Sequence, residues 1–266
     1  MPSRPPLNVS LVIDRSTSMQ GERMDTVKAA AIEIVRQLKA DDLLSIVVFS
    51  DRAEVLLPAR RRSARQNVET QIRMIPTGGG TEILQGLQAA LSEIRRHLSR
   101  EHINHVILLT DGRTYGDEEN CLRLAEEAVD WGVGISAFGI GEEWNDRFLD
   151  DLASRTGGAS YYISRPQDIR PFLQERFRAL EQIYAERVKL ELQVASGVEL
   201  RYAFRVQPEP SPAPIGSIFH LGSIPAKAQL SFLLEFVVPP VKASSGLAPL
   251  AEGYLSWVVP AQTDTR

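Results

Sequence analysis

The stretch VSLVIDRSTS at residues 9–18 joins an apolar run to a polar turn, and it decides the fold class. Residues 9–13 are apolar apart from one serine, which is typical of a strand buried on both faces. An amphipathic helix is expected next, because apolar side chains recur at helical spacing at Met24, Val27, Ala31, Ile34 and Leu38. A buried strand followed by such a helix is the repeating unit of an α/β fold.

The same unit repeats as far as about residue 182. Further strands are expected at 43–49, 53–57, 106–109, 133–140 and 161–163, and further helices at 83–98, 122–129, 148–152 and 169–180. This alternation predicts a doubly wound, mainly parallel sheet flanked by helices on both faces. Right-handed crossovers put the carboxyl ends of the parallel strands on one edge, where open sheets of this kind bind their ligands.

After residue 182 the apolar residues alternate with polar ones. This period of two appears at 188–194, 198–206, 230–238 and 255–259, and it predicts half-exposed antiparallel strands. We therefore divide the chain into an α/β domain at 1–182 and a β-rich domain at 183–266, the second a small β-sandwich or β-sheet. The polar residues 263–266 leave open whether the natural chain continues.

The charge balance of the sequence argues against one class of partner, nucleic acid. The formal net charge is −4 and no extended basic surface is indicated, so nucleic acid is not an expected partner. A short basic run at Arg60, Arg61, Arg62 and Arg65 is interpreted as a solvated loop and helix start.

The cysteine count and the apolar runs bear on the compartment in which the protein works. Cys121 is the sole cysteine, so no internal disulfide forms, which suits a reducing compartment. Residues 1–6 have no apolar signal core, and no apolar run is long enough to span a bilayer. We expect a cytoplasmic protein with no membrane contact.

Three polar elements follow or flank the predicted strands. Asp14, Ser16 and Ser18 come directly after the first strand, Thr81 follows three glycines at the mouth of a helix, and Asp111 follows the strand at 106–109. Each element alone is also typical of a helix cap or an ordinary turn. Together, at one sheet edge, their hard oxygen atoms predict a site for Mg²⁺ or Mn²⁺ rather than for zinc.

The set Asp14-x-Ser16-x-Ser18, Thr81 and Asp111-Gly112 resembles the metal-ion-dependent adhesion site of von Willebrand factor type A (VWA) domains, in a bacterial-type protein. The resemblance covers about residues 7–182 and implies the Rossmann-like fold of that family. It also implies that Ser16, Ser18 and Thr81 ligate the ion through their hydroxyls. Asp14 and Asp111 would act largely through bound waters, or directly when Thr81 moves away. The expected ion is Mg²⁺, with Mn²⁺ or Ca²⁺ as alternatives.

The resemblance further implies a protein partner that offers an acidic residue to the metal. Arginine and exposed aromatic residues are common interface anchors. On that ground the candidate partner-binding residues are those on the loops of the same edge, namely Arg15, Thr17, Arg113, Tyr115, Glu143 and Trp144. The sequence does not decide the oligomeric state.

Two other function classes stay open. A Mg²⁺-dependent hydrolase or phosphatase is disfavoured, because Asp14-Arg15-Ser16 lacks a second aspartate and no lysine lies in the three loops. We therefore expect no enzyme. The other alternative is a structural scaffold that binds partners through the β-rich domain without metal, since exposed alternating strands from Val188 onward are able to pair with another chain.

A zinc site is not predicted at His97, His102 and His105. These histidines straddle a helix end, a loop and a strand start, with no acidic or cysteine ligand at a matching spacing.

Overall fold

The structure of the protein is a computed structural model, and it describes residues 5–61, 67–111, 114, 116–141, 146–207, 210–240 and 249–259. A six-stranded sheet forms the first domain, in the order β3-β2-β1-β4-β5-β6. Its strands are β1 (Leu7–Asp14), β2 (Leu43–Phe49), β3 (Ala53–Arg61), β4 (Ile103–Thr110), β5 (Gly134–Ile140) and β6 (Ser160–Ile163).

The sheet is parallel except at one edge. β1 pairs in parallel with both β2 and β4, and the parallel pairing continues through β5 to β6, whereas β3 is antiparallel to β2. Every residue of β1, β2 and β4 is buried. The predicted doubly wound, mainly parallel sheet is confirmed, and the strand order reverses between β1 and β4, where open sheets place their ligand sites.

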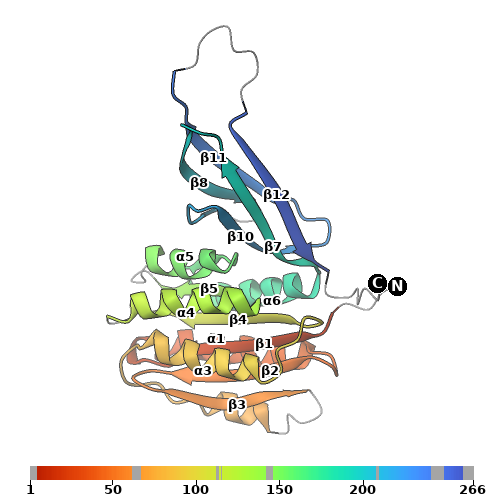
Figure 1. The fold of residues 1–266 in the computed structure, drawn as a ribbon. Helices are drawn as coiled ribbons and strands as arrows, with labels where there is room; N and C mark the ends of the chain where they lie inside the picture. Colours follow the sequence, from red (N-terminus) through yellow and green to blue (C-terminus); the bar gives the residue numbers. More distant parts are fainter. Residues whose placement is uncertain are drawn as a thin grey trace.

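Helices cover both faces of this sheet (Figure 1). One core cluster holds side chains from α1 (Glu22–Gln37), α2 (Val68–Arg73) and α6 (Pro166–Glu181). The other holds side chains from α3 (Ile83–Arg95), α4 (Glu118–Trp131) and α5 (Asp146–Arg155). A short 3₁₀ helix, η1 (Thr17–Met19), follows β1. No described helix is long and apolar enough to cross a membrane.

Two three-stranded antiparallel sheets follow, in the orders β10-β7-β12 and β11-β8-β9. Their strands are β7 (Ile183–Val194), β8 (Glu199–Gln207), β9 (Ser211–Pro212), β10 (Ile218–Pro225), β11 (Ser231–Val237) and β12 (Ala251–Val258). The two sheets share a small core, which includes Val188, Ala203 and Phe219. The predicted antiparallel pattern is thus confirmed.

Four local expectations differ from the structure. The basic run is only partly a loop, because β3 continues through Arg60 and Arg61 and pairs them with β2; Arg62 and Arg65 lie outside the described residues. The segment 207–214, whose prolines predict a loop, contains the short strand β9. β10 and α2 were not anticipated.

The second domain packs directly on the first. Buried Arg205 donates hydrogen bonds to the carbonyl oxygens of Gly157 (2.9 Å) and Gly158 (2.6 Å). Gly157 and Gly222 both have positive φ, at 73° and 77°. A Cβ added to Gly157 would lie 2.0 Å from the backbone nitrogen of Gly222. The two backbones therefore meet at a distance that no side chain at Gly157 permits.

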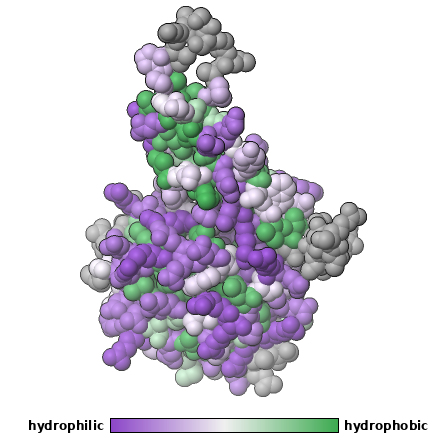
Figure 2. Space-filling view, in the orientation of Figure 1, coloured by the Kyte–Doolittle hydropathy of each residue, from purple (hydrophilic) through white to green (hydrophobic). Residues whose placement is uncertain are grey.

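Hydrophobic side chains gather on the visible face of the second domain, whereas the visible face of the first is mainly hydrophilic (Figure 2). Among the described strands, β12 pairs with β7 alone and lies at the edge of its sheet. Its Tyr254 is 78% exposed and its Trp257 54% exposed.

Candidate metal centre

Asp14 ends β1 at the centre of the sheet, and its carboxylate is fully buried. One carboxylate oxygen accepts a hydrogen bond from the backbone nitrogen of Ser16 (2.8 Å), and the other accepts one from Thr110 Oγ1 (2.6 Å). Burial raises the pKa of Asp14 to about 6; the charge of Asp111 adds to this rise, and the hydrogen bonds from Thr110 and Ser16 oppose it. A buried acid that is costly to ionise is stabilised in its charged form by a nearby cation.

Asp111 follows β4, the strand beside β1. Its Oδ1 accepts a hydrogen bond from Ser18 Oγ (2.8 Å), and its Oδ2 pairs with Nη1 of Arg23 from α1 (2.6 Å). Ser16 Oγ and Ser18 Oγ are 3.1 Å apart. The structure thus brings together four of the five predicted metal ligands, Asp14, Ser16, Ser18 and Asp111.

Thr81 lies on a loop that is bonded to the segment after β1. The backbone nitrogen of Gly78 donates to the Arg15 carbonyl oxygen (2.8 Å), and the backbone nitrogen and hydroxyl of Thr17 both donate to the Gly79 carbonyl oxygen (3.2 Å each). The Thr81 side chain is buried. Among the described residues no hydrogen bond joins it to the other four predicted ligands, so its role as a ligand stays a prediction.

The carboxylate of Asp51 lies close against the glycines of this loop. The backbone nitrogen of Gly80 donates to Asp51 Oδ1 (2.9 Å). A Cβ added to Gly79, where φ is +88°, would lie 2.5 Å from Asp51 Oδ2, and one added to Gly80 would lie 2.7 Å from Oδ1. The glycines therefore allow the carboxylate of Asp51 to lie against the loop and fix its path.

The first turn of α3 is anchored from the opposite side of the loop. Its Ile83 nitrogen donates to Thr114 Oγ1 (3.3 Å), and its Leu84 nitrogen donates to Asp117 Oδ2 (2.9 Å). The Thr114 hydroxyl in turn donates to the same aspartate. These side chains satisfy helix N–H groups that have no partner within the helix, and they hold the segment that carries Thr81.

The residues present fit a hard divalent cation. The donor set combines two buried carboxylates with hydroxyl oxygens, which are the ligands that Mg²⁺ and related ions prefer. Across the described part of the chain, no three His, Cys, Asp or Glu side chains gather as metal ligands. A cation at this edge would therefore need the serine and threonine hydroxyls as well as the carboxylates.

The structure describes only two of the six predicted partner-binding residues, Arg15 and Thr17. Thr17 is exposed, whereas Arg15 is half-buried and its Nε is a buried atom with no hydrogen bond among the described residues. Arg113, Tyr115, Glu143 and Trp144 lie outside the described residues. Their role in binding a partner stays a prediction.

Two residues of the site were missed by sequence reasoning, Thr110 and Arg23. The signal for Thr110 was its place beside Asp111 at the end of a buried strand. Arg23 gave no usable signal, since a basic residue in the first turn of a helix is commonplace.

The sequence matches the von Willebrand factor type A domain family over residues 8–184, and the chain belongs to this family. It is 30% identical over 198 residues to the uncharacterized protein sll0103 of Synechocystis sp., covering 74% of this chain and 47% of that protein. It is 29% identical over 185 residues to human inter-alpha-trypsin inhibitor heavy chain H4, covering 65% of this chain and 20% of that protein. The chain spans about half or less of the length of these curated relatives.

Solved structures share the fold. A von Willebrand factor type A protein from Catenulispora acidiphila superimposes with a TM-score of 0.78 at 21% identity, covering 96% of this chain and 63% of that one. Proximal thread matrix protein 1 from the mussel byssus, with a zinc-occupied MIDAS motif, gives a TM-score of 0.58 at 21% identity, covering 67% of this chain and 46% of that one. VWA domains commonly mediate protein interactions that depend on a divalent metal at this motif.

Proposed function

We propose that this chain is a metal-dependent protein-binding module and not an enzyme. One observation carries the proposal: the buried carboxylates of Asp14 and Asp111 and the hydroxyls of Ser16 and Ser18 form one hydrogen-bonded group at the edge where the strand order reverses. Such an edge is where open α/β sheets bind ligands.

In the proposed site Ser16, Ser18 and Thr81 offer hydroxyl oxygens to the ion, and Asp14 and Asp111 supply the negative charge. When bound, the ion supplies an electrophilic position for an acidic side chain of a partner protein. Mg²⁺ is the proposed ion, with Mn²⁺ or Ca²⁺ as alternatives. Zn²⁺ is included in the metal titration below, because the mussel protein has zinc in its MIDAS motif.

The remaining side chains position the ligands. Thr110 donates to Asp14 Oδ2, and Arg23 pairs with Asp111 Oδ2, so each carboxylate is held by a side chain outside the proposed ligand set. Such supporting contacts orient metal-bound carboxylates and tune the affinity of the ion.

The first test is a calorimetric titration of EDTA-treated protein with Mg²⁺, Mn²⁺, Ca²⁺ and Zn²⁺. We expect saturable one-to-one binding that Ser16→Ala abolishes. Ser45→Ala is the matched control, because Ser45 is a buried serine of the same sheet whose hydroxyl has no hydrogen bond among the described residues. Equal binding by wild type and Ser16→Ala contradicts the proposed site.

The same proteins separate the alternatives. Capture of a partner that survives EDTA and Ser16→Ala favours metal-independent binding through the second domain. Hydrolysis of a phosphate ester that requires metal and is lost in Ser16→Ala favours an enzyme. For a metal-dependent binding module we expect neither of these results. We expect instead that a partner is captured and that EDTA releases it.

A further inference from the structure

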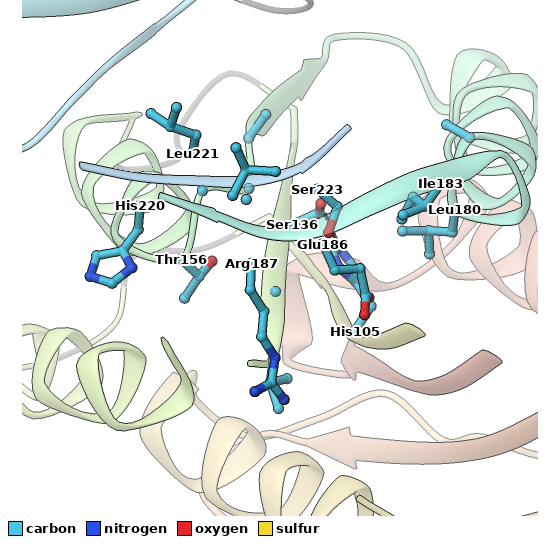
Figure 3. A pocket seen from close by; sticks show the side chains of 18 of the residues that line it. His105, Ser136, Thr156, Leu180, Ile183, Glu186, Arg187, His220, Leu221 and Ser223 are labelled. Atoms are coloured by element: carbon cyan, nitrogen blue, oxygen red, sulfur yellow. Dashed lines mark hydrogen bonds between the residues drawn. The ribbon is translucent and has the colours of Figure 1, made fainter. Parts of the chain in front are cut away.

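A cavity of about 180 Å³ lies between the two domains (Figure 3). His105, near the amino end of β4, and Gly134, at the amino end of β5, line it from the first domain. Glu186 and Arg187 of β7 line it from the second. Asp111 lies beyond the other end of β4, so the cavity and the metal centre occupy opposite edges of the sheet.

Glu186 is the unusual side chain of this cavity. It is 5% exposed, and its pKa is shifted by burial and by the charge of Arg187, with no hydrogen bond among the causes. Figure 3 shows its side chain extending in the direction of His105. A buried polar group without a hydrogen bond costs about 1–3 kcal/mol, so a folded protein rarely retains one without a use for it.

A bulge in β7 gives Glu186 and its neighbour their directions. Ser256 of β12 pairs with Lys189 of β7, and Val258 pairs with Glu186. Two steps along β12 therefore match three steps along β7, so β7 has one extra residue here. Arg187 has a φ of 51°, a left-handed conformation that costs a side-chain-bearing residue about 1–2 kcal/mol. Consecutive strand residues normally point to opposite faces, yet both side chains here extend to the same side (Figure 3).

The guanidinium of Arg187 is held at one end of α4. Its Nη2 donates to the carbonyl oxygen of Trp131 (2.9 Å). A Cβ added to Gly132 would lie 2.0 Å from its Nε, so the helix end is shaped to admit this side chain. The bulge in β7, the left-handed backbone of Arg187 and its hydrogen bond to Trp131 together place Glu186 and Arg187 on the cavity wall.

At neutral pH the charge on the cavity wall is positive. Burial raises the pKa of Glu186 to about 8, against the opposing charge of Arg187, and burial lowers the pKa of His105 to about 4. Burial also lowers the pKa of His220, which lines the same cavity. These three groups are mainly neutral near pH 7, and the remaining charged groups on the wall are cationic: Arg176, Arg187, Lys189 and Arg205.

The rest of the lining is largely apolar and includes Ile107, Val188 and Leu221. A positive wall disfavours an organic cation and favours an anion, while apolar side chains favour a ligand with a hydrocarbon body. A carboxyl group that keeps its proton is able to donate a hydrogen bond to an anionic oxygen.

We propose that this cavity binds a small organic acid, whose carboxylate lies between Glu186 and Arg187 and whose apolar body packs against the first domain. Glu186 donates a hydrogen bond to the carboxylate, and Arg187 supplies the positive charge. The site is independent of the metal centre, because it shares no residue with it.

The test uses the full chain and three fluorinated probes of one size, 4-fluorobenzoate, 4-fluorobenzamide and 4-fluorobenzylamine, titrated by ¹⁹F NMR. We expect saturable binding of the benzoate with a Kd below about 1 mM, and weaker binding of the other two. Between about pH 7 and pH 9.5 the affinity for the benzoate should fall roughly tenfold, because Glu186 loses the proton that it donates.

Three variants make the assignment specific. Glu186→Gln keeps a neutral donor, so it should bind the benzoate at pH 7 and lose the fall in affinity at high pH. Arg187→Gln should bind it at least roughly tenfold more weakly. Glu191→Gln, exposed on the same strand, is the matched control and should behave as wild type. Thermal melting of each variant establishes that it is folded.

Three outcomes overturn the proposal. The first is that the benzoate fails to saturate the protein at about 10 mM, well above the expected Kd. The second is that the benzylamine binds more tightly than the benzoate, which would assign the cavity to cations. The third is that a folded Arg187→Gln variant binds the benzoate as tightly as wild type.

Discussion

Arg23 donates to the same carboxylate that the proposed metal ion needs. Its Nη1 lies 2.6 Å from Asp111 Oδ2, and it also donates to the carbonyl oxygen of Ser18 (3.2 Å). A fixed positive charge here offsets part of the charge of Asp111 and repels a cation bound beside it. Arg23 therefore holds Asp111 in place at a cost to metal affinity.

Arg23→Gln is expected to bind Mg²⁺ roughly two- to tenfold more tightly than wild type, since it removes one like charge close to the ion. Titration calorimetry at low salt measures the difference. Arg36→Gln is the control, because Arg36 lies on the same helix but pairs with Glu69. Weaker binding by Arg23→Gln would mean that orienting Asp111 outweighs the repulsion.

Glu186 predicts a pH dependence of stability. Its pKa is raised from 4.5 to about 8 in the folded state, so the folded protein keeps a proton that the unfolded chain releases. The contribution of this proton to the free energy of unfolding is fully present below about pH 4.5, and it is lost as the pH rises through about 8. Glu186→Gln should therefore match wild type near pH 4.5 and exceed its free energy of unfolding near pH 9, by on the order of 2–4 kcal/mol.

Urea unfolding at the two pH values checks this expectation. Glu191→Gln, exposed on the same strand, should show no such difference between them. A Glu186→Gln variant that is no more stable than wild type at high pH would show that the acid ionises without penalty in the folded protein.

At the residue scale, the sequence pointed to four candidate metal ligands that the structure brings together, and it pointed less well to the residues that support them. Asp14, Ser16, Ser18 and Asp111 follow buried strands, and strand ends are readable from an apolar run that stops. Arg23 lies in the first turn of the α-helix that follows β1, and Asp51 follows the end of β2, so the sequence places both residues near this edge. It does not tell which atoms their side chains contact there.

The same distinction holds for whole elements. The strands β1, β2 and β4 were predicted because they are buried on both faces and therefore appear in the sequence as nearly continuous apolar runs. β10 was missed although Phe219 and Leu221 are buried and alternate, because Gly222 interrupts the run and its backbone has positive φ. α2, six residues long, is too short to show helical periodicity.

β4 offers the clearest test of core packing. Leu108 is fully buried at its centre, and Leu108→Ala should lower the free energy of unfolding by about 2–5 kcal/mol through lost contacts and the cavity that remains. Leu98→Ala, at a leucine that is 38% exposed, is the control and should cost less than about 1 kcal/mol. Chemical denaturation measures both; equal losses would contradict the described burial of β4.

At the scale of the whole molecule, the two domains meet where Gly157 and Gly222 approach each other. Gly157→Ala should weaken this junction, because the new Cβ meets the Gly222 backbone and backbone atoms cannot rotate away. We expect a loss of at least about 2 kcal/mol, beyond the roughly 1 kcal/mol that positive φ alone costs an alanine. Calorimetry should show the unfolding transition of the second domain moving to lower temperature.

Gly116→Ala is the matched control for that variant. Gly116 also has positive φ, at +77°, but a Cβ there would meet no atom of the described residues within 4 Å. It therefore carries the conformational cost without the collision. If the two variants lose the same stability, the close approach of the glycines contributes nothing to the junction.

The pairing of β1 with β4 has a consequence for the growing chain on the ribosome. Thr110 and Asp14, joined by a hydrogen bond, are separated by 96 positions in the sequence. During synthesis Asp14 and its serines emerge long before β4 exists to complete the sheet beside them. Closing so long a loop is entropically costly, so this edge of the sheet forms only after β4 has emerged. A nascent chain that ends before β4 has the Asp-x-Ser-x-Ser motif in full and no site in which to use it.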